Sequence, residues 1–586
     1  MDTNVTSLNV SAENLYTKNF AFVDTDQNII STIAVNENGS LNIGTESGDI
    51  YQGSNSIAIG NKSGETKQGN NAVAIGFSAG NSSQGNDSVA LGITAGGSNQ
   101  SSNCVAIGVE AGSISQGIKS VAIGSHSGEV NQNTFAVAIG ADAGKTEQGN
   151  YTVAIGLSAG MTSQSDSSIA IGNNAGQVIQ GQYSVAVGFQ AGNSNQANGA
   201  VAIGQGAGYS SQQSSSVAIG NVAGEIRQGE LSVAVGYQAG NFQQTAGAVA
   251  IGKNAGYSNQ SGSSVAIGDS SAVTSQGSTS VAIGFQAGNS NQSYNCIAIG
   301  NAAGQISQGS DSIAIGASSA QTLQESDCIA IGAFAGQTSQ KFNSIAIGTS
   351  AGQSNQSNDS IAIGTNAGNA SQVQYAVAIG SGAGQNSQGY CSVAIGTNAG
   401  RSSQGDNTIV LNATGDDLNG TEASAFYVGQ MRDDVVDAGA TGVMIYNSVT
   451  QEITRSTAKT FVIPHPLDDT KYLVHACLEG PEAGVYYRGE DSIVDGSTSK
   501  VITLPAYTSK FANFTVSVTV ICDAVYVPRL IGATKVEGGQ FTVHGSPGPF
   551  HWNVFGKRFD IEVEPVNTNI KILGDGPYTY VSSYEN

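Results

Sequence analysis

The stretch "SVAIGFQAGNSNQ" at residues 280–292 recurs along the chain almost unchanged, for example as "SVAVGFQAGNSNQ" at 184–196. The first glycine of this phrase recurs every 16 residues from Gly44 to Gly396, which gives 23 copies without an insertion. A half copy, "TIVLN" at 408–412, keeps the register and ends the series. A strict short period is typical of a solenoid in which each copy forms one coil.

Each copy reads S-[VI]-A-[IV]-G-x-x-A-G-x-x-x-Q-G-x-x, and its first five residues alternate small and β-branched side chains. This period of two predicts a short β-strand, and the glycines that follow it predict turns. Sixteen residues accommodate two short strands and two turns, so we expect an all-β chain with a parallel β-roll or β-solenoid shaft. We expect Val281 and Ile283 to face the inside of the coil and Ser280, Ala282 and Gly284 to face the other side.

One glutamine recurs in every copy, from Gln52 to Gln404, without exception. Adjacent coils lie about 4.8 Å apart in such a shaft, so each glutamine is expected to stack on its own copy. Stacked amides donate and accept hydrogen bonds along the axis, as in the ladders of cross-β structures. We therefore assign the glutamines a structural role, and the members of this ladder include Gln68, Gln84, Gln228, Gln292 and Gln404.

A coil this thin encloses little apolar volume, and the remaining strand face carries Ala and Ser. A flat face of small residues permits close packing of identical chains, so we expect a homo-oligomer, with a homotrimer as the favoured form. The phrase "SVAIG-x-x-A-G" resembles the head repeats of trimeric autotransporter adhesins over residues 40–412. This resemblance implies a left-handed parallel β-roll that assembles as a trimer.

Composition divides the chain into four segments. Residues 1–43 are predicted to be an N-terminal cap or attachment segment, 44–412 the repeat shaft, 413–458 a β connector and 459–586 a separate C-terminal β domain. The last segment holds four of the five histidines and the only tryptophan. Its strand-like runs are separated by Gly, Pro and Asp turns, which predicts an antiparallel β-sandwich-like domain for assembly, receptor binding or both.

Two stretches of the last segment, "FVIPHPLDDTKYLVHACLEGPEAGVYYRGE" at 461–490 and "FHWNVFGKRFDIEVEP" at 550–565, are similar to a domain near the ends of fibre-like proteins of phages and large double-stranded DNA viruses. This resemblance implies a virion fibre or spike at the particle surface. Its expected partners are further copies of itself, a capsid or other virion protein, and a glycan or receptor on the host surface. A cellular adhesin at an extracellular or cell-surface location is the alternative setting.

Charge and hydropathy argue against a nucleic-acid-binding or membrane-associated protein. The formal net charge of −22 argues against nucleic-acid binding through phosphate neutralisation and against docking on an anionic membrane. No apolar run approaches the roughly 18 residues that span a bilayer, so we expect no membrane insertion. The N-terminus "MDTNVTSLNVSAENLY" has no basic region followed by an apolar one, and we identify no secretory signal in it.

The cysteines show no CxxC pair, and three of them replace the serine that opens a repeat: Cys104, Cys296 and Cys328. The last two lie two coils apart, roughly 10 Å, which exceeds the usual reach of a disulfide. We therefore expect no disulfide between them.

Catalytic and metal-binding hypotheses concern the C-terminal domain. His475, Cys477 and Glu479 alternate along one strand face and have ligand types suited to a metal, but a strand face without metal is the favoured interpretation. His465, His475 and Glu482 contain the groups of an acid–base site, without the sequence context of a known one. We predict no enzyme, no cofactor and no metal. The alternative is a polysaccharide depolymerase that uses paired carboxylates.

Aromatic and basic residues at variable positions are candidate contacts for a glycan or a partner, and packing between chains is the other interpretation. On the shaft, three aromatic residues recur at a spacing of three coils, and in the C-terminal domain the candidates are of types that stack on sugars. These candidates are Phe189, Tyr237, Phe285, Tyr486, Tyr487, Arg488, His551 and Trp552. The leading functional hypothesis is a trimeric fibre or spike that attaches a virus particle to its host.

Overall fold

The structure is a computed structural model of the 586-residue chain. It describes residues 19–23, 29–429, 443–446, 453–456, 460–464, 467, 470, 472–476, 483–522, 528–559, 570–573 and 580–583. The chain divides into two compact units, Met1–Met431 and Arg432–Asn586. Among the described residues, the one helix is the short 3-10 helix η1 (Ala506–Lys510), and no helix is long and apolar enough to cross a membrane. The all-β prediction is confirmed.

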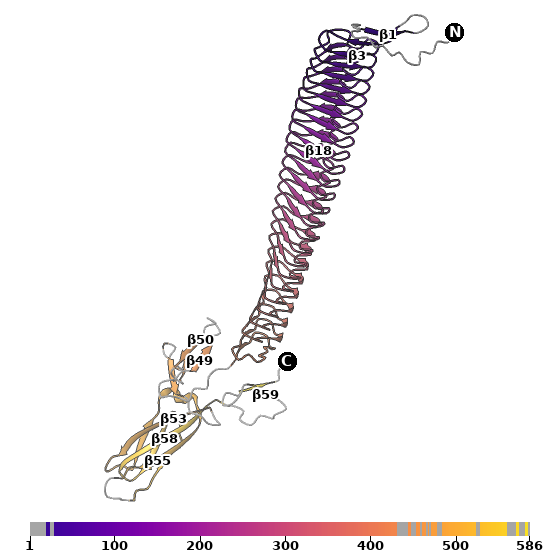
Figure 1. Cartoon of the computed structure of the whole chain (residues 1–586). Coiled ribbons are helices and arrows are strands. Elements are labelled where there is room, and N and C mark those ends of the chain that lie inside the picture. Colours follow the sequence, from indigo (N-terminus) through magenta and orange to yellow (C-terminus); the bar gives the residue numbers. More distant parts are fainter. Residues whose placement is uncertain are drawn as a thin grey trace. The chain divides into compact units, whose positions relative to one another are not determined.

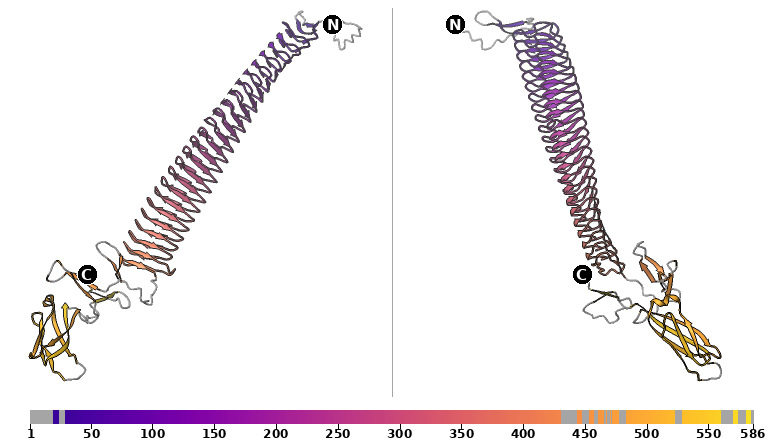
Figure 2. Two further views of the ribbon diagram at one scale, coloured as in Figure 1. Left: turned by 90° about the vertical axis from the view of Figure 1, so that its left-hand side faces the viewer. Right: turned by 180° about the vertical axis from the view of Figure 1, so that it is seen from behind.

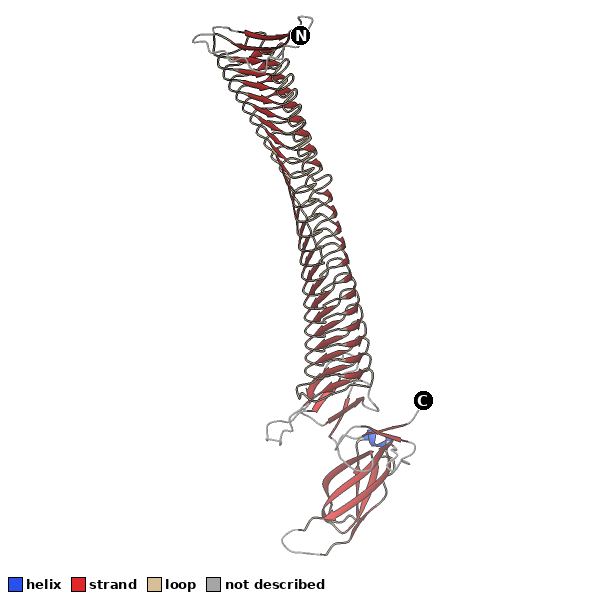
Figure 3. Ribbon diagram, turned by 45° about the vertical axis from the view of Figure 1, so that its right-hand side comes forward, coloured by secondary structure: helices blue, strands red, loops and turns tan. Residues whose placement is uncertain are grey.

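The first unit contains a parallel β-solenoid of about 24 turns of about 16 residues, as predicted (Figure 1). One side of every coil is a three-residue strand that pairs in parallel with the strand one coil away. Figure 3 shows these strands stacked along a gradually twisting shaft. The strands of this first sheet are β3 (Leu41–Ile43), β4 (Ile57–Ile59), β6 (Val73–Ile75), β8 (Val89–Leu91), β10 (Val105–Ile107), β12 (Val121–Ile123), β14 (Val137–Ile139), β16 (Val153–Ile155), β18 (Ile169–Ile171), β20 (Val185–Val187), β22 (Val201–Ile203), β23 (Val217–Ile219), β25 (Val233–Val235), β27 (Val249–Ile251), β29 (Val265–Ile267), β31 (Val281–Ile283), β33 (Ile297–Ile299), β35 (Ile313–Ile315), β37 (Ile329–Ile331), β39 (Ile345–Ile347), β41 (Ile361–Ile363), β43 (Val377–Ile379), β45 (Val393–Ile395), β47 (Ile409–Leu411) and β48 (Phe426–Val428).

The second side of the coil ends in the glutamine and forms two parallel sheets. Isolated bridges from Ser210 to Ser194 and to Ile226 connect these two sheets. The nine-stranded sheet contains β5 (Thr66–Gln68), β7 (Ser82–Gln84), β9 (Ser98–Gln100), β11 (Ile114–Gln116), β13 (Val130–Gln132), β15 (Thr146–Gln148), β17 (Thr162–Gln164), β19 (Val178–Gln180) and β21 (Ser194–Gln196). The twelve-stranded sheet contains β24 (Ile226–Gln228), β26 (Phe242–Gln244), β28 (Ser258–Gln260), β30 (Thr274–Gln276), β32 (Ser290–Gln292), β34 (Ile306–Gln308), β36 (Thr322–Gln324), β38 (Thr338–Gln340), β40 (Ser354–Gln356), β42 (Ala370–Gln372), β44 (Asn386–Gln388) and β46 (Ser402–Gln404).

Both ends of the solenoid differ from a regular coil. At the N-terminal end, β1 (Asn19–Val23) and β2 (Ile29–Val35) form an antiparallel hairpin, and β2 also pairs antiparallel with β3 (Figure 2). The hairpin covers the first edge of the parallel sheet, which would otherwise present unpaired backbone groups. At the other end, β47 pairs in parallel with β48, so the first sheet continues one turn beyond the shaft boundary predicted at residue 412.

The interior of the coil is lined by small and polar side chains, which is the reverse of our prediction. Ser280 and Ala282 are fully buried, whereas Val281 is half-buried and Ile283 is 36% exposed. The middle residue of the first-sheet strands from β4 to β45 is a fully buried alanine in every coil. The expectation that Val and Ile fill the inside is therefore wrong.

Steric limits explain this reversal. A Cβ atom added at Gly288 would lie 2.8 Å from Gln292 Oε1 and 3.1 Å from Ala282 Cβ. Both distances are shorter than ordinary carbon contacts, so alanine and the glutamine amide already fill the coil. A branched aliphatic side chain has no room inside, and the strand turns Val and Ile outward.

The first glycine of the repeat is required by the close approach of adjacent coils. Gly284 has a φ of +131°, and a Cβ atom there would lie 2.5 Å from the carbonyl oxygen of Gly300 in the next coil. L-residues rarely adopt this backbone conformation. The spacing between coils therefore depends on the absence of a side chain at this position.

The second unit contains two three-stranded antiparallel sheets that share one core. The first sheet has the order β53 (Ala483–Ile493), β58 (Gly548–Phe559), β55 (Ala512–Val520), and the second the order β54 (Ser499–Thr503), β57 (Gln540–Gly545), β56 (Ile531–Ala533). Buried residues of both sheets form the core: Ile493, Ile502, Leu504, Phe541, Val543, Phe550 and Val554. This arrangement agrees with the predicted sandwich-like domain.

The described residues of the same unit also form three further hairpins. They are β49 (Val443–Tyr446) with β50 (Ile453–Ser456), β51 (Thr460–Pro464) with β52 (Tyr472–Ala476), and β59 (Ile570–Leu573) with β60 (Tyr580–Ser583). All three are antiparallel pairs.

Candidate functional site

The invariant glutamine forms the predicted ladder inside the shaft. Gln292 Nε2 donates to Gln308 Oε1 at 3.0 Å, and Gln276 Nε2 donates to Gln292 Oε1 at 3.2 Å. The side chain of Gln292 also crosses the coil, because its Nε2 donates to the carbonyl oxygen of Val281 at 3.1 Å. Sequence reasoning missed this second bond, which joins the two sides of each coil.

Three of the other predicted ladder members, Gln68, Gln84 and Gln228, take part in the ladder. Gln68 Nε2 donates to Gln84 Oε1 at 3.2 Å, and Gln228 Nε2 donates to Gln244 Oε1 at 3.3 Å. Gln404 donates to two backbone carbonyls at 3.0 Å each but to no glutamine, and its Oε1 accepts no hydrogen bond, so its prediction as a ladder member is wrong. The Oε1 atoms of Gln100, Gln324 and Gln356 also accept no hydrogen bond, so the ladder is interrupted before each of these residues. These side chains are at most 3% exposed, so the glutamines are structural groups inaccessible to a ligand.

The cysteines at repeat-opening positions act as buried substitutes for serine. Cys296 Sγ donates to the carbonyl oxygen of Gly309 at 2.9 Å, and the side chain is fully buried. Burial raises the pKa of the Cys296 thiol to about 11, and it also raises the thiol pKa values of Cys104 and Cys328. All three are free cysteines, which confirms that no disulfide joins Cys296 to Cys328.

The outside of the first sheet is a continuous aliphatic surface. We define the aliphatic face as the first and third residues of the first-sheet strands from β4 to β47. Every one of these positions holds Val, Ile or Leu, and each side chain stacks in register on the next coil, as Val281 does on Ile297. The third residue is exposed in many coils, for example 41% at Ile395 and 39% at Ile251.

The three aromatic candidates of the shaft are exposed but do not form one site. Phe189, Tyr237 and Phe285 are 46%, 50% and 48% exposed. Each ring lies two positions after the third strand residue of its own coil. The three coils that carry these rings are spaced three coils apart along the shaft. Three coil spacings are roughly 14 Å, so the rings lie along one edge of the shaft without touching one another.

The five candidates of the C-terminal domain are divided between the two faces of one sheet. Tyr486, Arg488 and His551 are exposed on the outer face. Tyr487 packs against the core, and burial raises its pKa; Trp552 also packs there, with its ring centroid 5.7 Å from that of Phe541. The outer and inner groups could not be separated without knowing the strand register.

Cross-strand neighbours complete this outer face. Tyr486 lies opposite Phe555 on β58, with ring centroids 6.2 Å apart, and Arg488 lies opposite Asn553. Next to them is a hollow of about 570 Å³ lined by Arg488, Gly489, Glu490, Thr519, His551, Trp552 and Asn553. We define the platform as Tyr486, Arg488, Glu490, His551, Asn553 and Phe555. It combines an aromatic pair with several hydrogen-bonding groups.

The metal and acid–base hypotheses for residues 465–482 cannot be located on this surface. His475 lies on β52, opposite Phe461. Its proposed partners His465, Cys477, Glu479 and Glu482 lie outside the described residues. Within the described part of the chain, one cluster combines three potential metal ligands, and it lies on the shaft: Glu110, His126 and Glu129.

Comparisons with protein-family models, with curated proteins and with solved structures find no match to this chain. The resemblances to adhesin head repeats and to viral fibre domains therefore rest on the quoted motifs.

Removing a ladder amide should destabilise the shaft. Gln292→Leu leaves the Val281 carbonyl without its side-chain donor and interrupts the amide ladder. Each buried polar group left unsatisfied costs about 1–3 kcal/mol. We therefore expect a lower melting temperature by circular dichroism. The matched control is Asn291→Leu, because a leucine already occupies the same repeat position at Leu323; equal melting temperatures for the two variants would contradict the ladder's role.

The buried thiol should make stability depend on alkaline pH. The pKa of Cys296 is about 11 in the folded chain against a usual value of 9.0. Its stabilising effect is present below pH 9 and is lost as the pH rises towards 11, since the unfolded chain releases the proton first.

Cys296→Ser removes this titration and introduces serine, the residue that holds this position in most coils. We expect the melting temperature of the wild type, measured relative to that of the variant, to fall as the pH rises from 9.0 to about 11. A temperature difference that is independent of pH would show that the thiol does not titrate in this way.

Proposed function

We propose that the protein is a homo-oligomeric structural and adhesive fibre or spike, most simply a homotrimer. Its solenoid serves as the shaft, and its C-terminal domain guides assembly, binds a surface, or both. The observation that carries this proposal is the exposed aliphatic face, which has no covering element within the described residues of one chain.

The size and composition of the aliphatic face support self-association. It is 23 coils long and two outward residues wide, which corresponds to roughly 110 Å by 7 Å, or on the order of 800 Å². Monomeric proteins rarely expose contiguous apolar patches larger than a few hundred Å². No charged residue occupies any of its positions from Ile57 to Leu411.

Identical chains are the occupants that fit this face best. Each copy presents the same aliphatic ladder with the same 16-residue repeat, so two or three shafts in register bury these rows against one another along their whole length. The surface suited to packing is therefore the Val and Ile face, and the Ala and Ser face that we expected to pack between chains lies inside the coil. Three chains around one axis would enclose a continuous aliphatic core.

The biological setting rests on the two motif resemblances. They favour a virion surface, with a capsid or other virion protein as the anchoring partner and a host glycan or receptor as the target. Three C-terminal domains on one rigid shaft would raise the effective concentration of weak binding sites at a surface. A cellular adhesin at the cell surface is the alternative setting for the same architecture. The depolymerase alternative has no specific observation in its favour among the described residues.

Charging the aliphatic face should dissociate the oligomer. We expect the full chain to sediment with three times the mass of one chain. The triple variant Ile251→Asp, Ile267→Asp, Ile283→Asp places three carboxylates on the face in consecutive coils, where burial between chains would cost several kcal/mol for each. We expect this variant to shift towards lower mass in sedimentation equilibrium.

The control carries the same charges on the other side of the same coils. Ser258→Asp, Thr274→Asp and Ser290→Asp lie in register on β28, β30 and β32. The control should keep the mass of the wild type. A wild-type chain that sediments as a monomer, or a control that dissociates as the first variant does, would overturn the proposed interface.

The platform should contribute to glycan binding. Tyr486→Ala combined with Arg488→Ala removes one ring of the aromatic pair and the neighbouring guanidinium, two groups that stack on or hydrogen-bond to sugars. We expect at least a tenfold loss of affinity for the glycans that the wild type retains on a glycan array. Val501→Ala, at a 51%-exposed position on the second sheet, is the control. Absence of glycan binding by the wild type would remove the platform from the proposal.

A further inference from the structure

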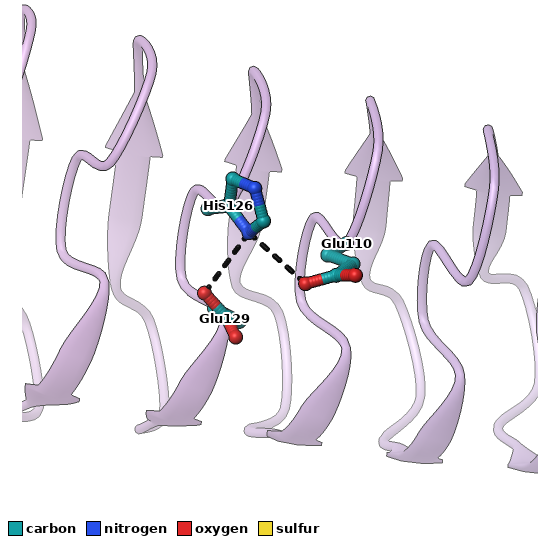
Figure 4. Close-up of side chains that lie close together, drawn as sticks. All are labelled: Glu110, His126 and Glu129. Atoms are coloured by element: carbon teal, nitrogen blue, oxygen red, sulfur yellow. Dashed lines mark hydrogen bonds and ion pairs between the residues drawn. The ribbon is translucent and has the colours of Figure 1, made fainter.

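The one histidine of the shaft lies between two glutamates from adjacent coils. His126 Nδ1 is 3.0 Å from Glu110 Oε2 and 3.1 Å from Glu129 Oε2. Glu129 belongs to the same coil as His126, whereas Glu110 holds the position of His126 one coil earlier. Figure 4 shows both carboxylates directed at the same ring nitrogen.

This convergence exceeds what one hydrogen bond requires. Nδ1 carries at most one proton, and a single N–H cannot point straight at two oxygen atoms. A metal ion, in contrast, accepts all three groups at once. Tetrahedral Zn²⁺ binds nitrogen and oxygen at about 2.0–2.1 Å, which places neighbouring ligand atoms about 3.3 Å apart. The two observed distances are close to this value.

We propose that Glu110, His126 and Glu129 form a binding site for a divalent transition-metal ion of the Zn²⁺ class. The imidazole nitrogen and two carboxylate oxygens supply three ligands of a kind that such ions accept. All three side chains are partly exposed, so water completes the coordination. With a neutral histidine the site carries two negative charges, which the ion balances. Because Glu110 and His126 lie in adjacent coils, the ion joins these coils.

Lys145 is the nearest competing cation. Its Nζ lies 3.7 Å from Glu129 Oε2 but only 2.9 Å from Asp142 Oδ1. The hydrogen bond to Asp142 is the main cause of the raised pKa of Lys145. Lys145 is therefore held mainly by Asp142, and Glu129 stays directed at His126.

The repeat contains a second cluster at the same three positions, four coils earlier, with lysine in place of histidine. Lys62 Nζ lies 3.1 Å from Glu46 Oε2 and 3.9 Å from Glu65 Oε1. An ammonium group forms ion pairs there but has no lone pair for a metal while it is protonated. This cluster shows what the same backbone positions do without a ligand nitrogen, and it supplies the controls.

The test uses the full chain and Zn²⁺ alone, measured by isothermal titration calorimetry near neutral pH, with Co²⁺ absorption as an independent report of coordination. We expect the wild type to bind one ion more per chain than His126→Lys, which copies the Lys62 cluster and keeps the ion pairs. Glu110→Gln should weaken binding at this site at least tenfold without removing the histidine.

The reciprocal variant tests for a gain of metal binding. Lys62→His should create a second site with Glu46 and Glu65 and add one further ion per chain. This arm is independent of any folding defect in His126→Lys, and circular dichroism verifies the fold of each variant. Equal stoichiometry in the wild type and a folded His126→Lys, or no effect of Glu110→Gln, would overturn the proposal and leave the cluster as an ion pair.

Discussion

The in-register hydrogen bonding of each coil to the next is the constraint on which the rest of the shaft depends. Val281 N donates to the carbonyl oxygen of Cys296, and Gly284 N donates to that of Ile267, both at 2.8 Å. Every residue therefore lies beside the residue 16 positions away. The backbone imposes this neighbour, and the side chain at each position must tolerate or exploit its own copy.

Different side chains respond to this constraint in different ways. Glutamine benefits because its amide both donates and accepts, so identical neighbours form a ladder. Aliphatic residues also gain from stacking on their own kind. Identical charges repel at this spacing, and some charged residues instead pair with the opposite sign in the adjacent coil, as in Lys253 with Asp269 and Lys341 with Glu325.

The period and the residue types were enough to predict the coil, the parallel stacking and the amide ladder, but not which strand face lies inside. Alternation shows that a strand has two faces, and large apolar residues usually occupy the buried one. A better criterion was present in the repeat: Ala282 has alanine as its counterpart in every coil from β4 to β45, whereas Val281 and Ile283 exchange freely with other aliphatic residues. Positions that accept either Val or Ile tolerate an added methylene group, which indicates that they lie outside the tightly packed interior of the coil. The platform could not be predicted because it depends on the register between β53 and β58. The cluster around His126 could not be predicted because it joins residues of adjacent coils, and a pattern within one segment does not show which side chains converge there.

The interchangeability of the coils has a genetic consequence. The segments at 184–196 and 280–292 differ at one residue, so recombination between such units would delete or duplicate whole multiples of 16 residues. Each unit gained or lost would change the length of the shaft by about 4.8 Å and would leave the glutamine ladder, the glycine contacts and the aliphatic rows intact. Any other length change would place unlike positions side by side. The reach of the protein can therefore evolve in discrete steps, separately from the domain that follows the shaft in the chain.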